Sequence, residues 1–291
     1  MNKSDNIATS LLEINAEDIG DVAVFLNKHM SGRLSTTMWG DVLRPRWPTS
    51  SSNSGFMLKD EAGKVVGVLC AIYSKQLIKG KEEQVCNLHS WAVLPKYRTK
   101  SISLVLTAIR QKGFHYTMFT PNKSGVEIFL YLKFKPLNDA VTPLLNVPLF
   151  WGSPKFTVIS DDDSFIDALS PRDRQVFNDH AAFPWLNRLM FRCVDKYGFI
   201  LYRRSKYKRL PSARILFISD RELFFQCWRD IRSYLLHKHK LFSSVIDSRF
   251  VEHKVSYSLP SKPSQQTFYL SSNLTPVDIE CVYSELMVLG L

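Results

Sequence analysis

The chain has 291 residues, of which 45% are hydrophobic and 22% charged, and its formal net charge is +11. This length can bury one large core or two cores of roughly 150 residues each. No stretch approaches the ~20 apolar residues that a membrane-spanning helix needs, and the first residues lack the apolar segment of a secretory signal. These features exclude a helical membrane protein and predict a soluble, cytoplasmic one. Its excess of basic residues favours anionic partners.

The cysteines do not form a recognisable framework. They are odd in number and widely separated, and no pair has the CxxC or Cys/His spacing that zinc requires. We therefore expect reduced thiols and no metal site at these positions: Cys70, Cys86, Cys193, Cys227 and Cys281.

The first half of the chain alternates strands and helices. A strand is predicted over 11–14 and a helix with regular apolar spacing over 16–30. Three strands then follow, separated by polar turns, at 55–58, 65–73 and 85–94. This order predicts an antiparallel meander after one strand–helix pair.

A long segment without acidic residues extends from Glu83 to Glu127. Near its middle, the third strand of the meander runs into a predicted helix. The start of a helix leaves about four backbone N–H groups without partners and carries roughly half a positive charge. With Lys96, Arg98 and Lys100 alongside, this junction is predicted to bind a phosphate group.

A crossover follows the junction. The helix predicted over 101–112 ends at Gly113, a favoured residue just beyond a helix C-terminus, and the strand 114–120 returns. A capping box at 124–127 predicts a further helix through Phe134. A strand, helix and strand of this length usually form a right-handed parallel crossover.

The second half repeats the middle of this order, in pattern rather than in residues. A proline-rich segment over 143–154 is expected to join the halves, which gives predicted domains of 1–148 and 149–291. The first repeated element is a hairpin with strands over 197–203 and 213–219 and a basic turn at 203–209. A helix over 221–238 and a strand over 242–250 follow.

Two helix starts are predicted in this half. Ser219 and Glu222 form a capping box before the helix over 221–238. Thr275 and Pro276 are predicted to begin the last helix of the chain. Its docking face would consist of Ile279, Val282, Leu286 and Met287.

The element order, combined with the motif Val93-x-Pro95-x-x-Arg98, resembles the GNAT acyltransferases over residues 8–148. In that family a V-x-P-x-x-R-x-x-G-x-G/A motif holds the pyrophosphate of coenzyme A. The resemblance implies an α/β fold: a mixed, mostly antiparallel sheet with flanking helices, present as two similar modules in tandem. It also implies that the cofactor is acetyl-CoA or another acyl-CoA.

The resemblance assigns cofactor-binding residues. Strand amides near Trp91 and Val93 would pair with the pantetheine arm, and Asn122 matches an asparagine that precedes the family's next helix. Ser101 and Ser103 replace the two loop glycines, so their Cβ atoms obstruct a close approach while their hydroxyls can donate hydrogen bonds. The segment expected to hold the pyrophosphate consists of Arg98, Thr99, Lys100, Ser101, Ile102 and Ser103.

This sequence matches the catalytic residues of the family less directly than it matches the cofactor-binding residues. Many members place a carboxylate on the strand over 85–94, where this chain offers only His89 and Ser90 as polar candidates. Phe129 takes the place of the tyrosine that commonly protonates the departing thiolate. Tyr131 lies two residues further, about 200° around the helix. The candidate catalytic residues are therefore His89, Ser90 and Tyr131.

The sequence thus predicts transfer of an acyl group from acyl-CoA to an amine of a small molecule. A nucleotide-linked amino sugar would suit the basic surface, and a homodimer is left open. The alternative is a catalytically inactive GNAT-fold protein with a binding or regulatory role, because the loop glycines, the tyrosine and the strand carboxylate are all missing.

A third hypothesis is nucleic-acid binding by the basic run at 203–209, which has Tyr202 and Tyr207 interleaved. A solvated hairpin tip explains the same run more simply, because charged turns are common. Nucleic acid is accordingly not expected as a partner.

Overall fold

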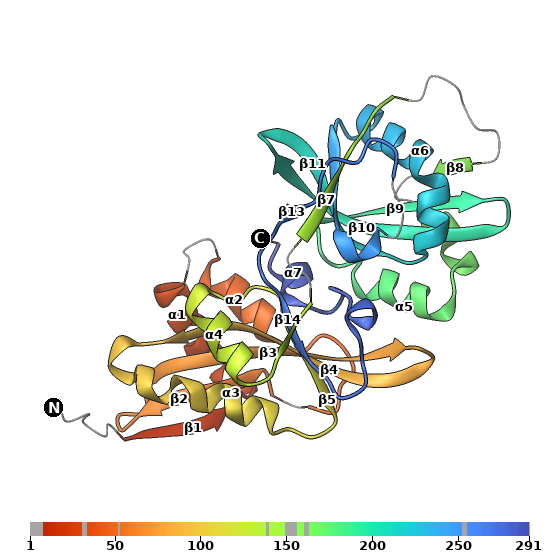
Figure 1. Cartoon of the computed structure of the whole chain (residues 1–291). Helices are drawn as coiled ribbons and strands as arrows, with labels where there is room; N and C mark the ends of the chain where they lie inside the picture. The colour runs from red at the N-terminus through yellow and green to blue at the C-terminus, as the bar shows by residue number, and fades with distance from the viewer. Residues whose placement is uncertain are drawn as a thin grey trace. The chain divides into compact units, whose positions relative to one another are not determined.

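The computed structural model describes residues 8–30, 34–51, 53–137, 140–148, 156–159, 163–251 and 255–290. Over these residues the chain forms two seven-stranded sheets in two compact units (Figure 1). The first unit runs to Pro136 and also includes Thr267–Thr275 and Tyr283–Glu285. The second contains the remaining segments: Leu137–Gln266, Pro276–Val282 and the residues from Leu286 onward.

The first sheet has the strand order β1-β2-β3-β4-β5-β14-β6. The predicted meander is confirmed, because β2, β3 and β4 pair antiparallel, and β4 pairs parallel with β5 after the crossover. The strands are β1 (Thr9–Glu13), β2 (Gly55–Asp60), β3 (Val65–Ile78), β4 (Lys81–Val93), β5 (Phe114–Met118), β6 (Lys135–Pro136) and β14 (Phe268–Leu270).

Helices pack against this sheet through apolar faces. In α3 the buried residues are Leu104, Val105 and Ala108, spaced as one helix face requires, and they join a core built from β2 to β5. A 3-10 helix, Pro95–Lys100, leads into α3. The α-helices of this unit are α1 (Ile19–His29), α2 (Thr36–Leu43), α3 (Ser101–Ile109) and α4 (Lys123–Tyr131).

The second sheet has the order β13-β7-β12-β11-β10-β9-β8. The predicted repeat is present: β10 and β11 form a hairpin, and β11 pairs parallel with β12 across α6 (Arg221–His237). The strands are β7 (Ala140–Leu145), β8 (Phe156–Ile159), β9 (Leu186–Cys193), β10 (Lys196–Tyr207), β11 (Leu210–Ile218), β12 (Ser243–Asp247) and β13 (Lys262–Pro263). A further helix, α5 (Pro171–Asp179), precedes β9.

Each of the two sheets includes one strand from the other half of the chain. After β6 the chain leaves the first sheet and supplies β7 to the second, where Pro143 pairs opposite Val245. Much later β14 returns to the first sheet, between β5 and β6 (Figure 1). The segment predicted as a proline-rich crossing therefore begins within a sheet strand. The units are interleaved along the sequence, and the division into domains at 148 and 149 remains a proposal.

Two helices begin at a residue other than the predicted cap. Asn122, not Ser124, caps α4, because its Oδ1 accepts a hydrogen bond from the Gly125 amide at 2.7 Å. Asp220 caps α6 by accepting from the Leu223 amide at 2.9 Å. Ser219, the predicted cap, instead accepts from the Phe199 amide of the adjacent strand.

The C-terminal segment was predicted to form one helix, and this prediction is wrong. It forms a 3-10 turn, Pro276–Asp278, and the short helix α7 (Glu285–Val288). Tyr283 has a φ of 59°, a left-handed conformation that cannot continue a right-handed helix. Three of the four expected apolar residues are nevertheless buried, with exposed fractions of 3% or less for Ile279, Val282 and Met287, and Leu286 is half-buried.

The basic run of the second hairpin also differs from its prediction. Arg203 and the residues up to Tyr207 belong to β10, and only Lys208 and Arg209 form the turn, both with positive φ. No helix in the described part of the chain is long and apolar enough to span a membrane.

Replacing Phe268 tests the return of β14 to the first sheet. Its ring is 1% exposed and stacks on Phe129, so Phe268→Ala is expected to lower the free energy of unfolding by about 3–5 kcal/mol. Phe242, which is 45% exposed, provides the control, and Phe242→Ala should cost far less. Chemical denaturation measures both, and equal losses would contradict the placement of β14.

Candidate active site

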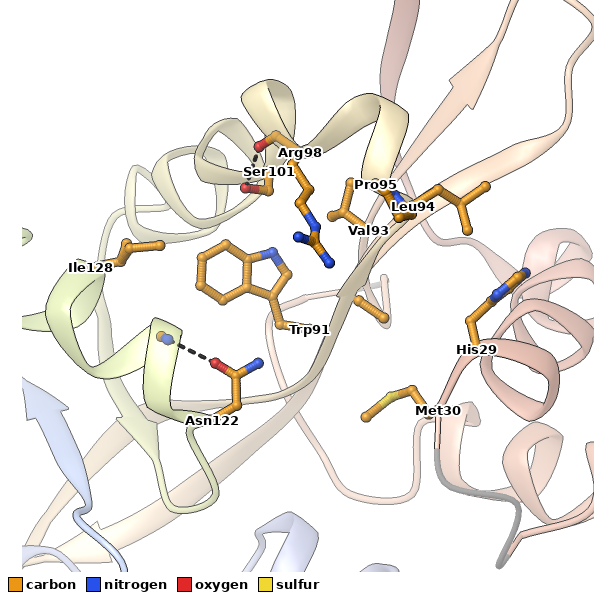
Figure 2. Close-up of a pocket in the computed structure, with 12 residues that line it drawn as sticks. His29, Met30, Trp91, Val93, Leu94, Pro95, Arg98, Ser101, Asn122 and Ile128 are labelled. Carbon is orange, nitrogen blue, oxygen red and sulfur yellow. Dashed lines mark hydrogen bonds between the residues drawn. The ribbon is translucent and has the colours of Figure 1, made fainter.

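A cavity of about 550 Å³ lies in the first unit where β4 ends. Its walls come from the end of β4, the start of α3, the start of α4 and the end of α1 (Figure 2). The lining residues are His29, Met30, Trp91, Ala92, Val93, Leu94, Pro95, Arg98, Ser101, Asn122, Gly125 and Ile128. None of them is acidic, so Arg98 gives the cavity a positive charge.

The cavity lies beyond the point where two parallel strands stop pairing. The last pair of β4 with β5 is Asn87 with Thr117, yet β4 continues to Val93. On the β5 side, no strand of the described chain pairs with this last part of β4. Its backbone groups on that side are therefore available to an extended ligand that adds to the sheet edge.

A β-bulge directs the end of β4. The register passes from Cys70 opposite His89 to Val68 opposite Ala92, so two residues of β4 face one of β3. Within the bulge Ser90 has a φ of 48°, an uncommon conformation for a residue other than glycine. Bulges of this kind redirect side chains next to functional sites. Here the following residue, Trp91, lines the cavity.

Trp91 forms the floor of the cavity. Its ring packs edge-on against Phe129 with centroids 5.9 Å apart, and Phe129 is fully buried. Arg98 and Asn122 lie on opposite sides of the indole in Figure 2. The indole Nε1 is buried and has no hydrogen-bond partner among the described residues.

The junction expected to hold a phosphate through free amides has a different geometry. The 3-10 helix runs without interruption into α3, and the Ser101 amide donates to the Arg98 carbonyl. The serine hydroxyls are also occupied. Ser101 Oγ donates to the Arg98 carbonyl at 2.7 Å and Ser103 Oγ to the Lys100 carbonyl at 2.6 Å (Figure 2 shows the first). Both hydroxyls would have to turn away from these carbonyls to contact a phosphate, and that contact stays a prediction.

The cavity brings together some of the predicted cofactor residues and leaves out others. Its lining includes Trp91, Val93, Arg98, Ser101 and Asn122. It does not include Thr99, Lys100, Ile102 or Ser103. The helical geometry accounts for this division, because consecutive residues of a helix point to different sides.

Asn122 contributes to the cavity through its position as a helix cap. Its Oδ1 is held by the Gly125 amide, and a Cβ at residue 125 would approach that oxygen to 3.1 Å. Glycine at 125 therefore leaves room for the capping geometry and for the open wall beside it.

The predicted catalytic side chains do not line the cavity. The His89 ring is 1% exposed, its Nδ1 lies 2.9 Å from Ser90 Oγ, and burial lowers its pKa to about 3. It is neutral at pH 7, and a pKa this low makes it a weak proton acceptor there. Tyr131 is 77% exposed and lies outside the lining residues.

The structure places one carboxylate that the sequence reasoning missed, Glu285, where β4 and β5 stop pairing. Its backbone amide donates to Asn87 Oδ1 at 3.0 Å, and its Oε1 accepts from the Thr120 hydroxyl at 2.9 Å. The side chain is 1% exposed and is not among the residues that line the cavity, and its Oε2 has no partner among the described residues.

Burial raises the pKa of Glu285 to about 7, against the lowering effect of the Thr120 hydrogen bond. A carboxylate with a pKa near neutrality is suited to accept and release protons at physiological pH. No local sequence pattern connects it with β4, because 198 residues separate it from Asn87.

Comparison of the sequence with protein-family models finds no match, and comparison with curated proteins finds none either. Solved structures do match. A GCN5-related N-acetyltransferase from Anabaena variabilis superposes with a TM-score of 0.57 at 12% identity, over 90% of this chain and 72% of that one. One from Kribbella flavida gives 0.57 at 14% identity, over 92% and 72% of the two chains.

Eis1 from Mycobacterium abscessus gives a TM-score of 0.52 at 12% identity, over 90% of this chain and 73% of that one. Identities this low establish the fold alone. The chain has the GNAT fold, in an α/β arrangement of two similar modules with mostly antiparallel sheets.

The raised pKa of Glu285 predicts a pH-dependent stability. The folded state holds this proton more tightly than the unfolded state, in which the pKa of the glutamate is near 4.5. The stability that this tighter binding contributes is fully present below about pH 4.5 and is lost as the pH rises through about 7. Glu285→Gln should remove this loss. Urea denaturation across that pH range measures it, with Glu127→Gln in α4 as an exposed control. Parallel pH dependences for wild type and Glu285→Gln would refute the assignment.

Proposed function

We propose that this protein transfers an acyl group from acyl-CoA to the amine of a small molecule. The observation that carries the proposal is the combination, in one unit, of a basic cavity at the open edge of β4 and a buried carboxylate where β4 leaves β5. The GNAT fold of both modules supports it, since the matched structures include N-acetyltransferases.

The cavity suits the thioester co-substrate in size and charge. Its volume falls in the range of about 300–1,000 Å³ typical of small-molecule sites. The edge of β4 from Trp91 to Val93 can pair with the amides of a pantetheine arm as an added strand would. Arg98 supplies a cation for the phosphates, and the absence of carboxylates among the lining residues avoids repulsion.

Glu285 is proposed as the general base. An amine attacks a thioester only when neutral, so the proton of its ammonium form must leave. Oε2 of Glu285, which has no partner among the described residues, would receive that proton while Thr120 holds Oε1. The amine nitrogen then forms its bond to the acyl carbon, the carbon–sulfur bond breaks, the thiolate departs, and the nitrogen releases its second proton to solvent to give the amide.

Positioning is expected to provide most of the rate. Holding the thioester and the amine together can supply about 7–11 kcal/mol of the barrier reduction. The fixed bulge at Ser90 and the packed ring of Trp91 give β4 the rigidity that such positioning needs. Phe129, buried where the resemblance places a tyrosine, has no proton to donate, so the thiolate would take its proton from solvent.

The chemical class of the acceptor is proposed from the net charge of the protein. With a net charge of +11, an anionic amine such as a nucleotide-linked amino sugar would be attracted to the protein. Panels of amino sugars, free and nucleotide-linked, test this point directly.

The inactive binding protein is the second candidate, and one observation favours it. The hydroxyls of Ser101 and Ser103 and the amide of Ser101 are all engaged within their own helices, so a pyrophosphate would find fewer donors there. This function predicts binding of CoA without turnover, or no binding.

Charge reversal at Arg98 tests the cofactor site. Arg98→Glu should weaken CoA binding tenfold or more, about 1.4 kcal/mol, because a carboxylate replaces the cation that lines the cavity. Arg110→Glu makes the same change at the far end of α3 and should leave affinity nearly unchanged. Titration calorimetry with acetyl-CoA gives both values, and absence of binding at millimolar concentration would defeat the proposal.

Replacement of Glu285 tests the base. Glu285→Gln should lower kcat about 10²- to 10⁴-fold at unchanged acetyl-CoA affinity, and the wild-type rate should fall as the pH drops below about 7. Release of free CoA in the presence of the amine panel measures the rate. Glu127→Gln is the matched control. Full activity in the Glu285→Gln variant would show that another group removes the proton.

A further inference from the structure

A second cavity, of about 630 Å³, lies in the second unit beside α6. It is lined by one face of that helix and by the chain that follows β12, and it shares no residue with the cavity of the first unit. The residues that matter for its chemistry are Phe225, Gln226, Trp228, Arg229, Arg232 and Phe250.

The charge of this cavity is unbalanced. Three guanidinium groups line it, against one carboxylate, Glu222, which already accepts from the Gln226 amide at 3.2 Å. Arg221 lies 3.7 Å from Glu280 and is thereby compensated in part. The lining therefore keeps a positive surplus, and Arg232 is the buried arginine in it.

Arg232 is the most informative of these side chains. It is only 8% exposed, and among the described residues its Nε has no hydrogen-bond partner and its guanidinium forms no ion pair, although the carboxylate of Asp230 compensates its charge in part. Its guanidinium lies 4.5 Å from the centroid of the Tyr257 ring, which compensates for only part of the lost hydration. Burial lowers the pKa of Arg232. Burying an unpaired cation is costly, and a bound anion would offset that cost.

The rest of the lining is aromatic. Phe225, Trp228 and Phe250 supply flat apolar walls, and Arg221 stacks on Phe250 at 4.1 Å. Aromatic rings of this kind recognise planar groups by stacking, and arginine recognises carboxylates and phosphates. We propose that this cavity is a binding site of the second module for an organic anion that carries a planar aromatic group.

Calorimetric titration with 2-naphthyl phosphate and 2-naphthoate tests the site with the two anionic head groups. 2-Naphthalenemethanol carries the same ring without charge. Binding of at least one anion, tenfold or more tighter than the uncharged compound and unchanged by saturating CoA, is expected. Tighter binding of the phosphate or of the carboxylate identifies the head group that the site prefers.

Two variants test whether the anionic probe binds in this cavity. Arg232→Leu should weaken binding of the anion tenfold or more, with Lys238→Leu at the end of the same helix as its control. Because Arg232 is buried, Gln226→Trp provides a second test from an exposed lining position, where added bulk should block the cavity. Gln175→Trp on α5 is its control. No binding at millimolar concentration, or binding that Gln226→Trp leaves intact and Arg98→Glu removes, would overturn the proposal.

Discussion

The candidate active site depends on where β4 and β5 stop pairing. Two parallel strands that separate leave backbone groups without partners, and those groups must find others. In the first unit the C-terminal segment meets side chains at the point of separation, because the Glu285 amide donates to Asn87 Oδ1 and the Thr120 hydroxyl donates to the Glu285 carboxylate. Further along β4 the edge stays open and borders the cavity. The buried carboxylate and the open edge thus both lie where the pairing of β4 with β5 is interrupted.

Burial controls the chemistry of the ionisable groups around this interruption. Desolvation lowers the pKa of His89 and raises that of Glu285, so that both favour their neutral forms. At neutral pH His89 is therefore uncharged and takes up no proton, whereas the pKa of the Glu285 carboxyl group lies close to neutral pH. The histidine on β4 is thus held neutral, and the carboxyl group whose pKa lies near neutrality comes from a distant part of the chain.

The two units use the same order of elements with different electrostatics. In the first, the 3-10 helix before α3 carries Arg98 and Lys100 and no carboxylate. In the second, Asp220 caps α6 and Glu222 lies in its first turn, so the positive end of the helix is already compensated. In the second unit a buried arginine without an ion pair among the described residues, Arg232, lies along the side of α6. Equivalent helices therefore offer different positions for an anion.

Local patterns in the sequence determined the meander, the crossover, the repeated order of elements and the basic junction after Val93, because apolar periodicity and turn residues act over a few positions. They also identified Trp91, Val93, Arg98, Ser101 and Asn122, which the structure brings to one cavity. The exchange of β7 and β14 and the position of Glu285 depend on pairing between residues far apart in the chain. The closed 3-10 geometry at Arg98 likewise came only from the folded chain. Local patterns carry no information about such contacts, so only the tertiary structure decided which carboxylate meets β4.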